Sequence, residues 1–108
     1  YIGLMKNTAT TARARAALGH EPRVDVFRFL VLAGDDVLIV SDIAVHTELA
    51  LSTLSHHLRT LVSAGLVTQE RRGREVVNRA DFKAVDAALT FLTAECCQGV
   101  ALIREDAA

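Results

Sequence analysis

The chain has 108 residues, a length typical of one domain. Its formal net charge of −1 excludes a uniformly basic nucleic-acid binder, and aromatic residues make up only 5% of it against 51% apolar residues. The core must therefore be aliphatic, which favours helices packed on helices. No apolar run approaches the ~18–20 residues that cross a bilayer, so we expect no membrane partner and a location in the cytoplasm, where thiols stay reduced.

The first half of the chain predicts three helices. Residues 9–18 are rich in Ala and Arg and end at Gly19, a residue type that often stops a helix. A second helix restarts around Pro22, which is favoured in a first turn, and ends at Gly34. After the short β-rich segment DDVLIV, the hydroxyl of Ser41 is expected to cap a third helix.

The stretch LSTLSHHLRTLVSAGL predicts a strongly amphipathic fourth helix. Its apolar residues recur at helical spacing, at Leu51, Leu54, Leu58, Leu61 and Val62. The opposite face is small, hydrogen-bonding and cationic, with Ser52, His56, Arg59 and Ser63. His57 lies on the flank of the apolar stripe, so core packing and ligand contact both stay open for it. Gly65 is expected to end the helix.

The next stretch, LVTQERRGREVVNRA, alternates at the strand period on both sides of RRGR and predicts a β-hairpin. Gly73 supplies the tight turn, which carries Arg71, Arg72 and Arg74. This hairpin follows the helices as a small arginine-rich wing.

The stretch DFKAVDAALTFLTAECC predicts a long last helix, capped by Asp81. Its apolar stripe has a near-heptad spacing that suits packing against another helix, at Phe82, Val85, Leu89, Leu92 and Cys96. The whole order predicts a mainly α fold with a small β-hairpin wing, which is a winged helix-turn-helix with a helical dimer interface. We expect a flexible N-terminus over 1–8, the DNA-binding and dimerisation domain over 9–97 and a tail over 98–108.

Positive charge gathers around the fourth helix and the wing. Residues 51–79 hold five Arg against two Glu, whereas residues 80–108 hold two basic against five acidic residues. We expect operator DNA to be read at base edges by Ser52, His56 and Arg59, with His57 beside them, and held at its phosphates by Thr53, Ser55, Arg71, Arg72 and Arg74. In a homodimer, two such helices about 34 Å apart would match an inverted repeat.

Four segments together resemble the arsenic-repressor (ArsR-type) family of bacterial metal-sensing repressors. They are ALGHEPRVDVFRFL, SDIAVHTEL, STLSHHLRTLVSAGLV and RRGREVVNR, and the likeness covers roughly residues 14–97. The resemblance implies a homodimeric, non-enzymatic repressor that leaves its DNA when it binds a soft metal or metalloid. No nucleophile, base and orienting group form a recognisable catalytic set, which agrees with that expectation.

The sequence departs from the family at three places. Ile39 and Ser41 stand where the best-known arsenic site has cysteines, and Lys83 stands where a last-helix metal site would have a histidine. Both of those metal sites are therefore missing. Ala50 replaces the usual Ser or Asn cap before the fourth helix, which leaves the first residue of that helix open.

Cys96 and Cys97 are neighbours and are the only cysteines of the chain. Consecutive Cα atoms lie about 3.8 Å apart, whereas disulfides prefer roughly 4.4–6.8 Å, so we expect no stable bridge between them. Near the helix end, just before Gly99, the backbone is expected to turn both sulfurs toward one thiophilic centre. The alternative that Cys96 simply belongs to the apolar core stays open.

The segment FLTAECC is similar to the C-terminal site of a subgroup that senses trivalent arsenic. This implies Cys96 and Cys97 as ligands and trivalent arsenic, an organoarsenical or antimony as inducer. Inorganic arsenite generally takes three thiolates, so the third ligand is left to solvent, a small thiol, the partner subunit or a cysteine outside this sequence. An organoarsenical needs only two. A redox-responsive repressor with the same thiols, and a DNA-binding module without an inducer, remain as alternatives.

Overall fold

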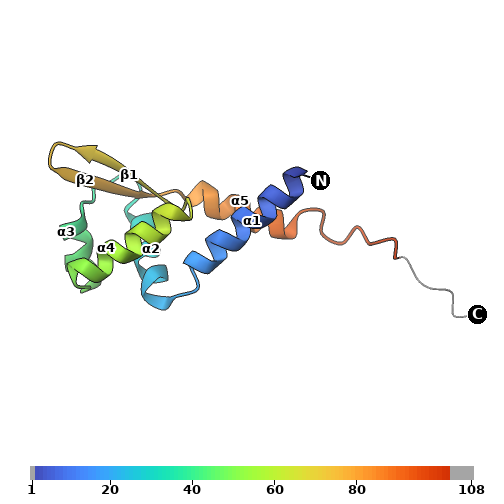
Figure 1. Cartoon of the computed structure of the whole chain (residues 1–108), viewed down its shortest axis with the longest axis horizontal. Helices are drawn as coiled ribbons and strands as arrows, with labels where there is room; N and C mark the ends of the chain where they lie inside the picture. The colour runs from blue at the N-terminus through green and yellow to red at the C-terminus, as the bar shows by residue number, and fades with distance from the viewer. Residues whose placement is uncertain (1, 103–108) are drawn as a thin grey trace, which may run out of the picture.

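The computed structural model describes residues 2–102 and has the winged helix-turn-helix architecture that the sequence predicts (Figure 1). Within the described residues, five helices are joined by a two-stranded antiparallel hairpin that projects from one end of the helical part (Figure 1). In chain order the elements are α1 (Ile2–Ala17), α2 (Glu21–Ala33), α3 (Val40–Thr47), α4 (Leu51–Ser63), β1 (Val67–Arg72), β2 (Glu75–Ala80) and α5 (Phe82–Thr93). The mainly α fold class is thus confirmed.

The core lies between α2, α3, α4 and the base of the hairpin, with the last two turns of α1 against it. It is almost wholly aliphatic, as the composition predicts, and includes Val26, Leu30, Ile43, Leu54, Leu58, Leu61, Leu66 and Val67. Each leucine buried in this way contributes about 1.5–3 kcal/mol through the hydrophobic effect. The three leucines of α4 thereby hold its opposite face toward solvent.

The C-terminus of α4 is closed by a Schellman motif at the predicted glycine. Gly65 has a φ of 78°, and its amide donates to the carbonyl of Val62 at 2.9 Å. The amide of Leu66 donates to the carbonyl of Leu61, also at 2.9 Å. These bonds satisfy two orphan carbonyls and turn the chain directly into β1.

The hairpin turn also follows the prediction. Arg72 pairs with Glu75, so the loop has two residues, and Gly73 occupies its first position with a φ of 62°. A positive φ at the first loop residue and not at the second, Arg74, distinguishes a type II′ turn from a type I′ turn, and glycine is the favoured residue at that first position.

Three features of the first half of the chain differ from the sequence predictions. The first helix begins at Ile2 rather than near residue 9. The third begins at Val40, so Ser41 is inside it, and the cap comes instead from Asp42, whose carboxylate accepts from the amide of Ile39 at 3.2 Å. The β-rich segment before it contributes only one isolated bridge, between Ile39 and Val77.

The last helix ends at Thr93, before the two cysteines, rather than running through them. Asp81 caps its start as predicted, since its carboxylate accepts from the amide of Ala84 at 3.3 Å. At the other end, Glu95 and Cys97 have φ values of 58° and 69°. An α-helix cannot continue through such left-handed residues, so the cysteines lie in turns beyond it.

Candidate nucleic-acid interface and thiol pair

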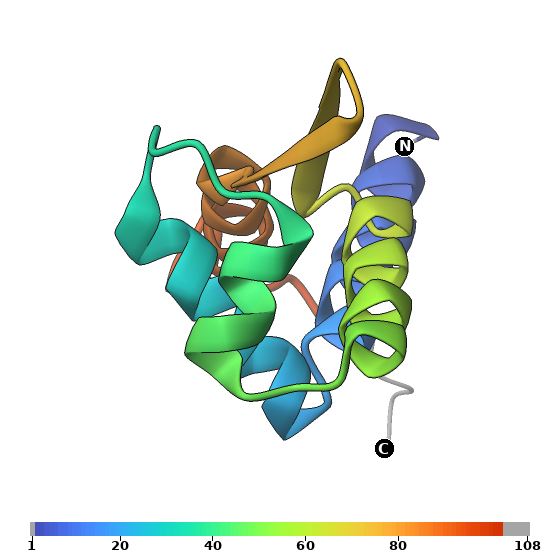
Figure 2. The same cartoon turned by 90° about the vertical axis from the view of Figure 1, so that its left-hand side faces the viewer.

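The polar face of α4 points away from the core, as its sequence pattern predicts. Ser52, Thr53, His56 and Arg59 are exposed, and Ser55 is half-buried. Figure 2 views the molecule from the end that carries α3 and the hairpin. It shows α4 beside α3 and in front of α1, at one edge of the helices. The structure therefore brings five of the six predicted α4 contacts to the surface.

His57, the sixth, is an interior residue. Only 5% of its surface is exposed, and its Nδ1 accepts from the Nε of Arg23 at 3.4 Å. The His20 ring lies 5.2 Å away, centre to centre. Burial lowers the pKa of His57 from its ordinary 6.5, and the Arg23 guanidinium lowers it further. Of the two readings that the sequence left open, the structure supports core packing, and His57 leaves the set of direct DNA contacts.

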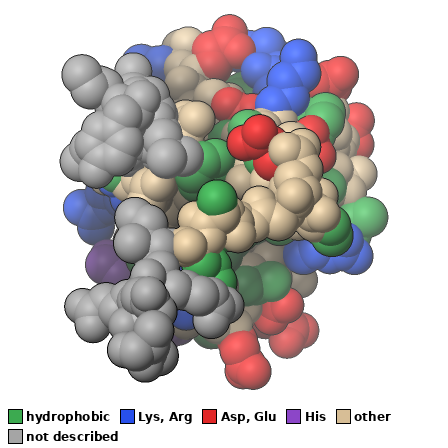
Figure 3. Space-filling model, turned by 90° about the vertical axis from the view of Figure 1, so that its right-hand side faces the viewer, with side chains coloured by type: hydrophobic (Ala, Val, Ile, Leu, Met, Phe, Trp, Pro, Cys, Tyr) green, Lys and Arg blue, Asp and Glu red, His purple; other side chains and the backbone are tan. Residues whose placement is uncertain are grey.

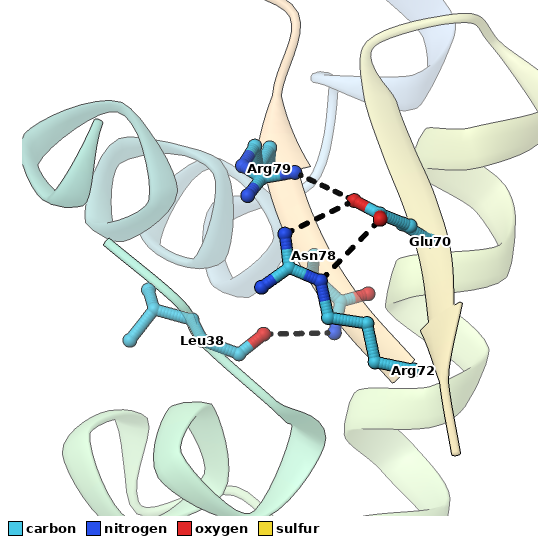
Figure 4. A network of polar contacts seen from close by, with 5 residues as sticks. All are labelled: Leu38, Glu70, Arg72, Asn78 and Arg79. Carbon is cyan, nitrogen blue, oxygen red and sulfur yellow. Dashed lines mark hydrogen bonds and ion pairs between the residues drawn. The ribbon is translucent and has the colours of Figure 1, made fainter. Parts of the chain in front are cut away.

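The three wing arginines are all exposed, but they are not equivalent. Glu70 on β1 accepts from the Nε of Arg72 at 3.3 Å and from Arg79 on β2 at 3.1 Å (Figure 4). The hydrogen bond from Arg72, followed by that from Arg79, lowers the pKa of Glu70. Within residues 2–102, Arg71 and Arg74 form no ion pair. Sequence reasoning missed this network, although the cross-strand pairing of a hairpin brings such residues together.

A buried asparagine fixes the base of the wing. The backbone amide of Asn78 donates to the carbonyl of Leu38 at 2.8 Å, and the side-chain Nδ2 of Asn78 donates to the same carbonyl at 3.4 Å (Figure 4). Gln69 on the neighbouring strand donates to the Asn78 side-chain oxygen at 2.7 Å. Because buried polar groups are costly unless paired, these bonds lock the hairpin to the segment that leads into α3.

The two cysteines lie exposed beyond α5, at the end of the molecule away from the hairpin (Figure 1). Their Cα atoms are 3.8 Å apart, and the structure joins their sulfurs in a disulfide, which differs from the expectation of no bridge. The left-handed backbone at Glu95 and Cys97, absent from a regular helix, accompanies this meeting of the two sulfurs. Cys96 is therefore not a core residue.

No third protein ligand stands beside the thiol pair in the part of the chain that the structure describes. Among residues 2–102, no group of three or more His, Cys, Asp or Glu side chains is arranged to hold a metal ion. The donor set at this place is two sulfurs.

An apolar face runs along α5 and its neighbour α1. No residue of α5 is fully buried, and Phe82, Leu89 and Leu92 are each more than half exposed. Between α1 and α5 lies an open groove of about 590 Å³, lined mainly by apolar residues that include Ala14, Leu18, Val85, Ala88 and Leu92. In Figure 3, which looks at this end, hydrophobic side chains reach the surface among charged ones.

A family model described as a helix-turn-helix domain matches residues 18–70. A search of the curated proteins finds no match. Within residues 2–102, no helix has the length and apolar character needed to cross a membrane.

Several solved structures share the fold. An ArsR-like transcriptional regulator from Rhodococcus sp. RHA1 is 27% identical, with a TM-score of 0.70 over 79% of this chain and 77% of that one. HlyU from Vibrio cholerae N16961 is 29% identical, with a TM-score of 0.66 over 86% and 98%. The homodimeric winged helix-turn-helix DNA-binding domain of Mb0332 from Mycobacterium bovis, a possible ArsR-family regulator, is 28% identical, with a TM-score of 0.64 over 82% and 77%.

Proposed function

We propose, on the premise that the chain belongs to the ArsR-type family of winged helix-turn-helix transcriptional regulators, that it is a cytoplasmic repressor which binds operator DNA as a homodimer. The observation that carries this proposal is the pairing of the exposed Ser, His and Arg face of α4 with an arginine-bearing wing. A helix whose buried leucines fix its polar side outward is suited to entering a major groove.

The contacts divide into two sets. Ser52, His56 and Arg59 face base edges, where arginine and guanine form a favoured pair. The phosphates are held by Thr53, Ser55, Arg71, Arg72 and Arg74, which set the register of the protein on the duplex. His57 contributes indirectly, because it packs α4 against the start of α2 and so holds the DNA-reading residues in place.

A second copy of the chain covers the apolar face of α1 and α5. An exposed stripe that contains Phe82, Leu89 and Leu92 is costly in water, and a two-fold partner offers the same stripe in return. The Mycobacterium bovis relative is homodimeric, which supports this arrangement.

Cys96 and Cys97 form the inducer site, and trivalent arsenic is the inducer. A cellular thiol first reduces the Cys96–Cys97 disulfide, and the two adjoining thiols then suit a soft, thiophilic centre. Each thiol loses its proton as its sulfur bonds to arsenic, and an organoarsenical needs no further protein ligand. Inorganic arsenic or antimony takes its third ligand from solvent, a small thiol or the partner subunit. Capture reshapes the chain at the end of α5, beside the dimer face, and so changes the separation of the two α4 helices. A coupling of about 1–3 kcal/mol would be typical.

One observation favours a second candidate, a redox-responsive repressor. The structure joins the two exposed cysteines in a disulfide, which is the oxidised form that such a repressor would take. In this candidate, oxidation of the two thiols to a disulfide replaces metalloid binding as the signal.

Titration of a preformed protein–DNA complex separates these candidates. Under reducing conditions, release by arsenite or by an aryl arsenical supports the metalloid repressor. The ratio of the two concentrations that release half of the DNA reports how many sulfur ligands the site supplies. Release by oxidant alone supports the redox candidate, and release by neither leaves a DNA-binding module without an inducer. The Cys96→Ser, Cys97→Ser double variant is the control, and it should bind DNA normally and respond to nothing. An unchanged arsenical response in that variant contradicts the site.

A further inference from the structure

An apolar side chain opens the DNA-reading helix. Leu51 is the first residue of α4, and 59% of its surface is exposed. The later leucines of the same helical stripe, Leu54, Leu58 and Leu61, are buried in the core. Leu51 continues the hydrophobic pattern of the sequence, yet the fold leaves it on the surface.

The position of Leu51 separates it from the exposed apolar residues of α5. The apolar stripe of α5 lies at the opposite end of the molecule from the start of α4 (Figure 1). Around Leu51 the neighbouring α4 residues are Ser52, which is exposed, and Ser55, which lies one helical turn later on the same side. Leu51 therefore lies at the exposed N-terminal end of α4, on the flank of the polar face proposed to read DNA, and not on the dimer face.

The N-terminal residues of a recognition helix are the ones that reach base edges. Most groups on the major-groove edge of a base pair are hydrogen-bond donors or acceptors, which a leucine would leave unpaired. The exception is the C5-methyl group of thymine, the apolar group of that groove. Resting on the DNA-binding function proposed above, we infer that Leu51 packs against a thymine methyl in each operator half-site and selects a T·A pair there.

The test removes this methyl group alone. The wild-type protein first selects a duplex from a random-sequence library, and each thymine of the selected site is then replaced in turn by deoxyuridine. We expect one thymine per half-site whose replacement weakens binding about fourfold, the effect of one buried methylene-sized group. The Leu51→Ala variant should bind the thymine and uracil duplexes equally.

Leu32→Ala is the matched control, because it removes the same atoms from a leucine that is 74% exposed on α2. It should keep the wild-type preference for thymine, and both variants should keep the wild-type thermal midpoint. Specific binding with no methyl-sensitive thymine, or a sensitivity that persists in Leu51→Ala, overturns the inference and leaves the DNA-binding function intact. Failure to select any duplex overturns both.

Discussion

At the scale of single residues, the wing shows how one carboxylate modifies a basic surface. Glu70 accepts from both Arg72 and Arg79, so these guanidinium groups have a partner before any phosphate arrives (Figure 4). Exposed ion pairs are weak, and the network can open with little effect on stability. Each arginine that turns to DNA must nevertheless exchange one anion for another.

We therefore expect Glu70→Gln to tighten DNA binding and to steepen its salt dependence. The change frees Arg72 and Arg79 for phosphates, and each added phosphate contact raises the slope of log K against log salt by about 0.9. Affinity measured at several salt concentrations checks this. Glu75→Gln makes the same charge change on the same hairpin, at a residue with no ion pair among the described residues, and should have the smaller effect. Equal effects would show that only net charge matters.

The buried His57 should make the fold sensitive to pH. Its pKa is lowered from 6.5 in the folded protein, first by burial and then by Arg23. The unfolded chain therefore binds the proton more readily, and stability falls as pH drops below about 6.5 toward the folded pKa. The thermal midpoint should fall between about pH 7 and pH 5, and His57→Gln, which keeps an acceptor for Arg23, should flatten that fall. If the exposed His56→Gln variant flattens it equally, His57 is not the responsible group.

At the scale of elements, the two ends of α4 are capped differently. Its C-terminus has the full Schellman pattern at Gly65, whereas at its N-terminus Ala50 supplies no side-chain acceptor. The helix nevertheless begins directly after Ala50, so the missing cap does not move its start. Burial of the three leucines outweighs a cap, which contributes only about 1 kcal/mol.

Ala50→Ser should therefore stabilise the free protein by about 0.5–2 kcal/mol, because the hydroxyl accepts from an orphan amide of the first turn. Chemical denaturation measures the change. Ala12→Ser makes the same substitution at an exposed interior position of α1, where serine is a slightly poorer helix former, and should give no gain. A gain at both positions would mean that capping is not the cause.

At the scale of the whole molecule, one copy of the chain leaves an apolar surface on α1 and α5 exposed to solvent. The core of α2, α3 and α4 is closed, but Leu89 on α5 remains 58% exposed. The two cysteines proposed as the inducer site follow this surface in the chain, whereas the start of α4, the helix proposed to read DNA, lies at the other end (Figure 1). Communication between them therefore depends on how two copies are joined.

Leu89→Asp should dissociate the proposed dimer and weaken operator binding. A carboxylate buried in an apolar interface costs about 2 kcal/mol or more, which is roughly a thirtyfold loss of dimer affinity. Sedimentation and DNA affinity check the two effects. Thr90→Asp puts the same charge on the next residue, which follows Asp86 by one turn on the polar side of α5, and should remain dimeric. A dimeric Leu89→Asp protein would place the interface elsewhere.

The sequence by itself determined the features that depend on neighbours along the chain. The fold class, the polar side of α4, the glycines at residues 65 and 73 and the Asp81 cap were all predictable, because helical period, strand period and turn chemistry are local. The vicinal thiols were equally plain in the sequence.

Tertiary structure decided what depends on contacts between elements. Packing against α2 placed His57 inside while His56 stayed outside, although the two residues are adjacent and identical in type. Strand pairing brought Glu70 to Arg79, nine residues away. Burial and pairing are set by groups that meet only when the chain folds, so no local pattern specifies them.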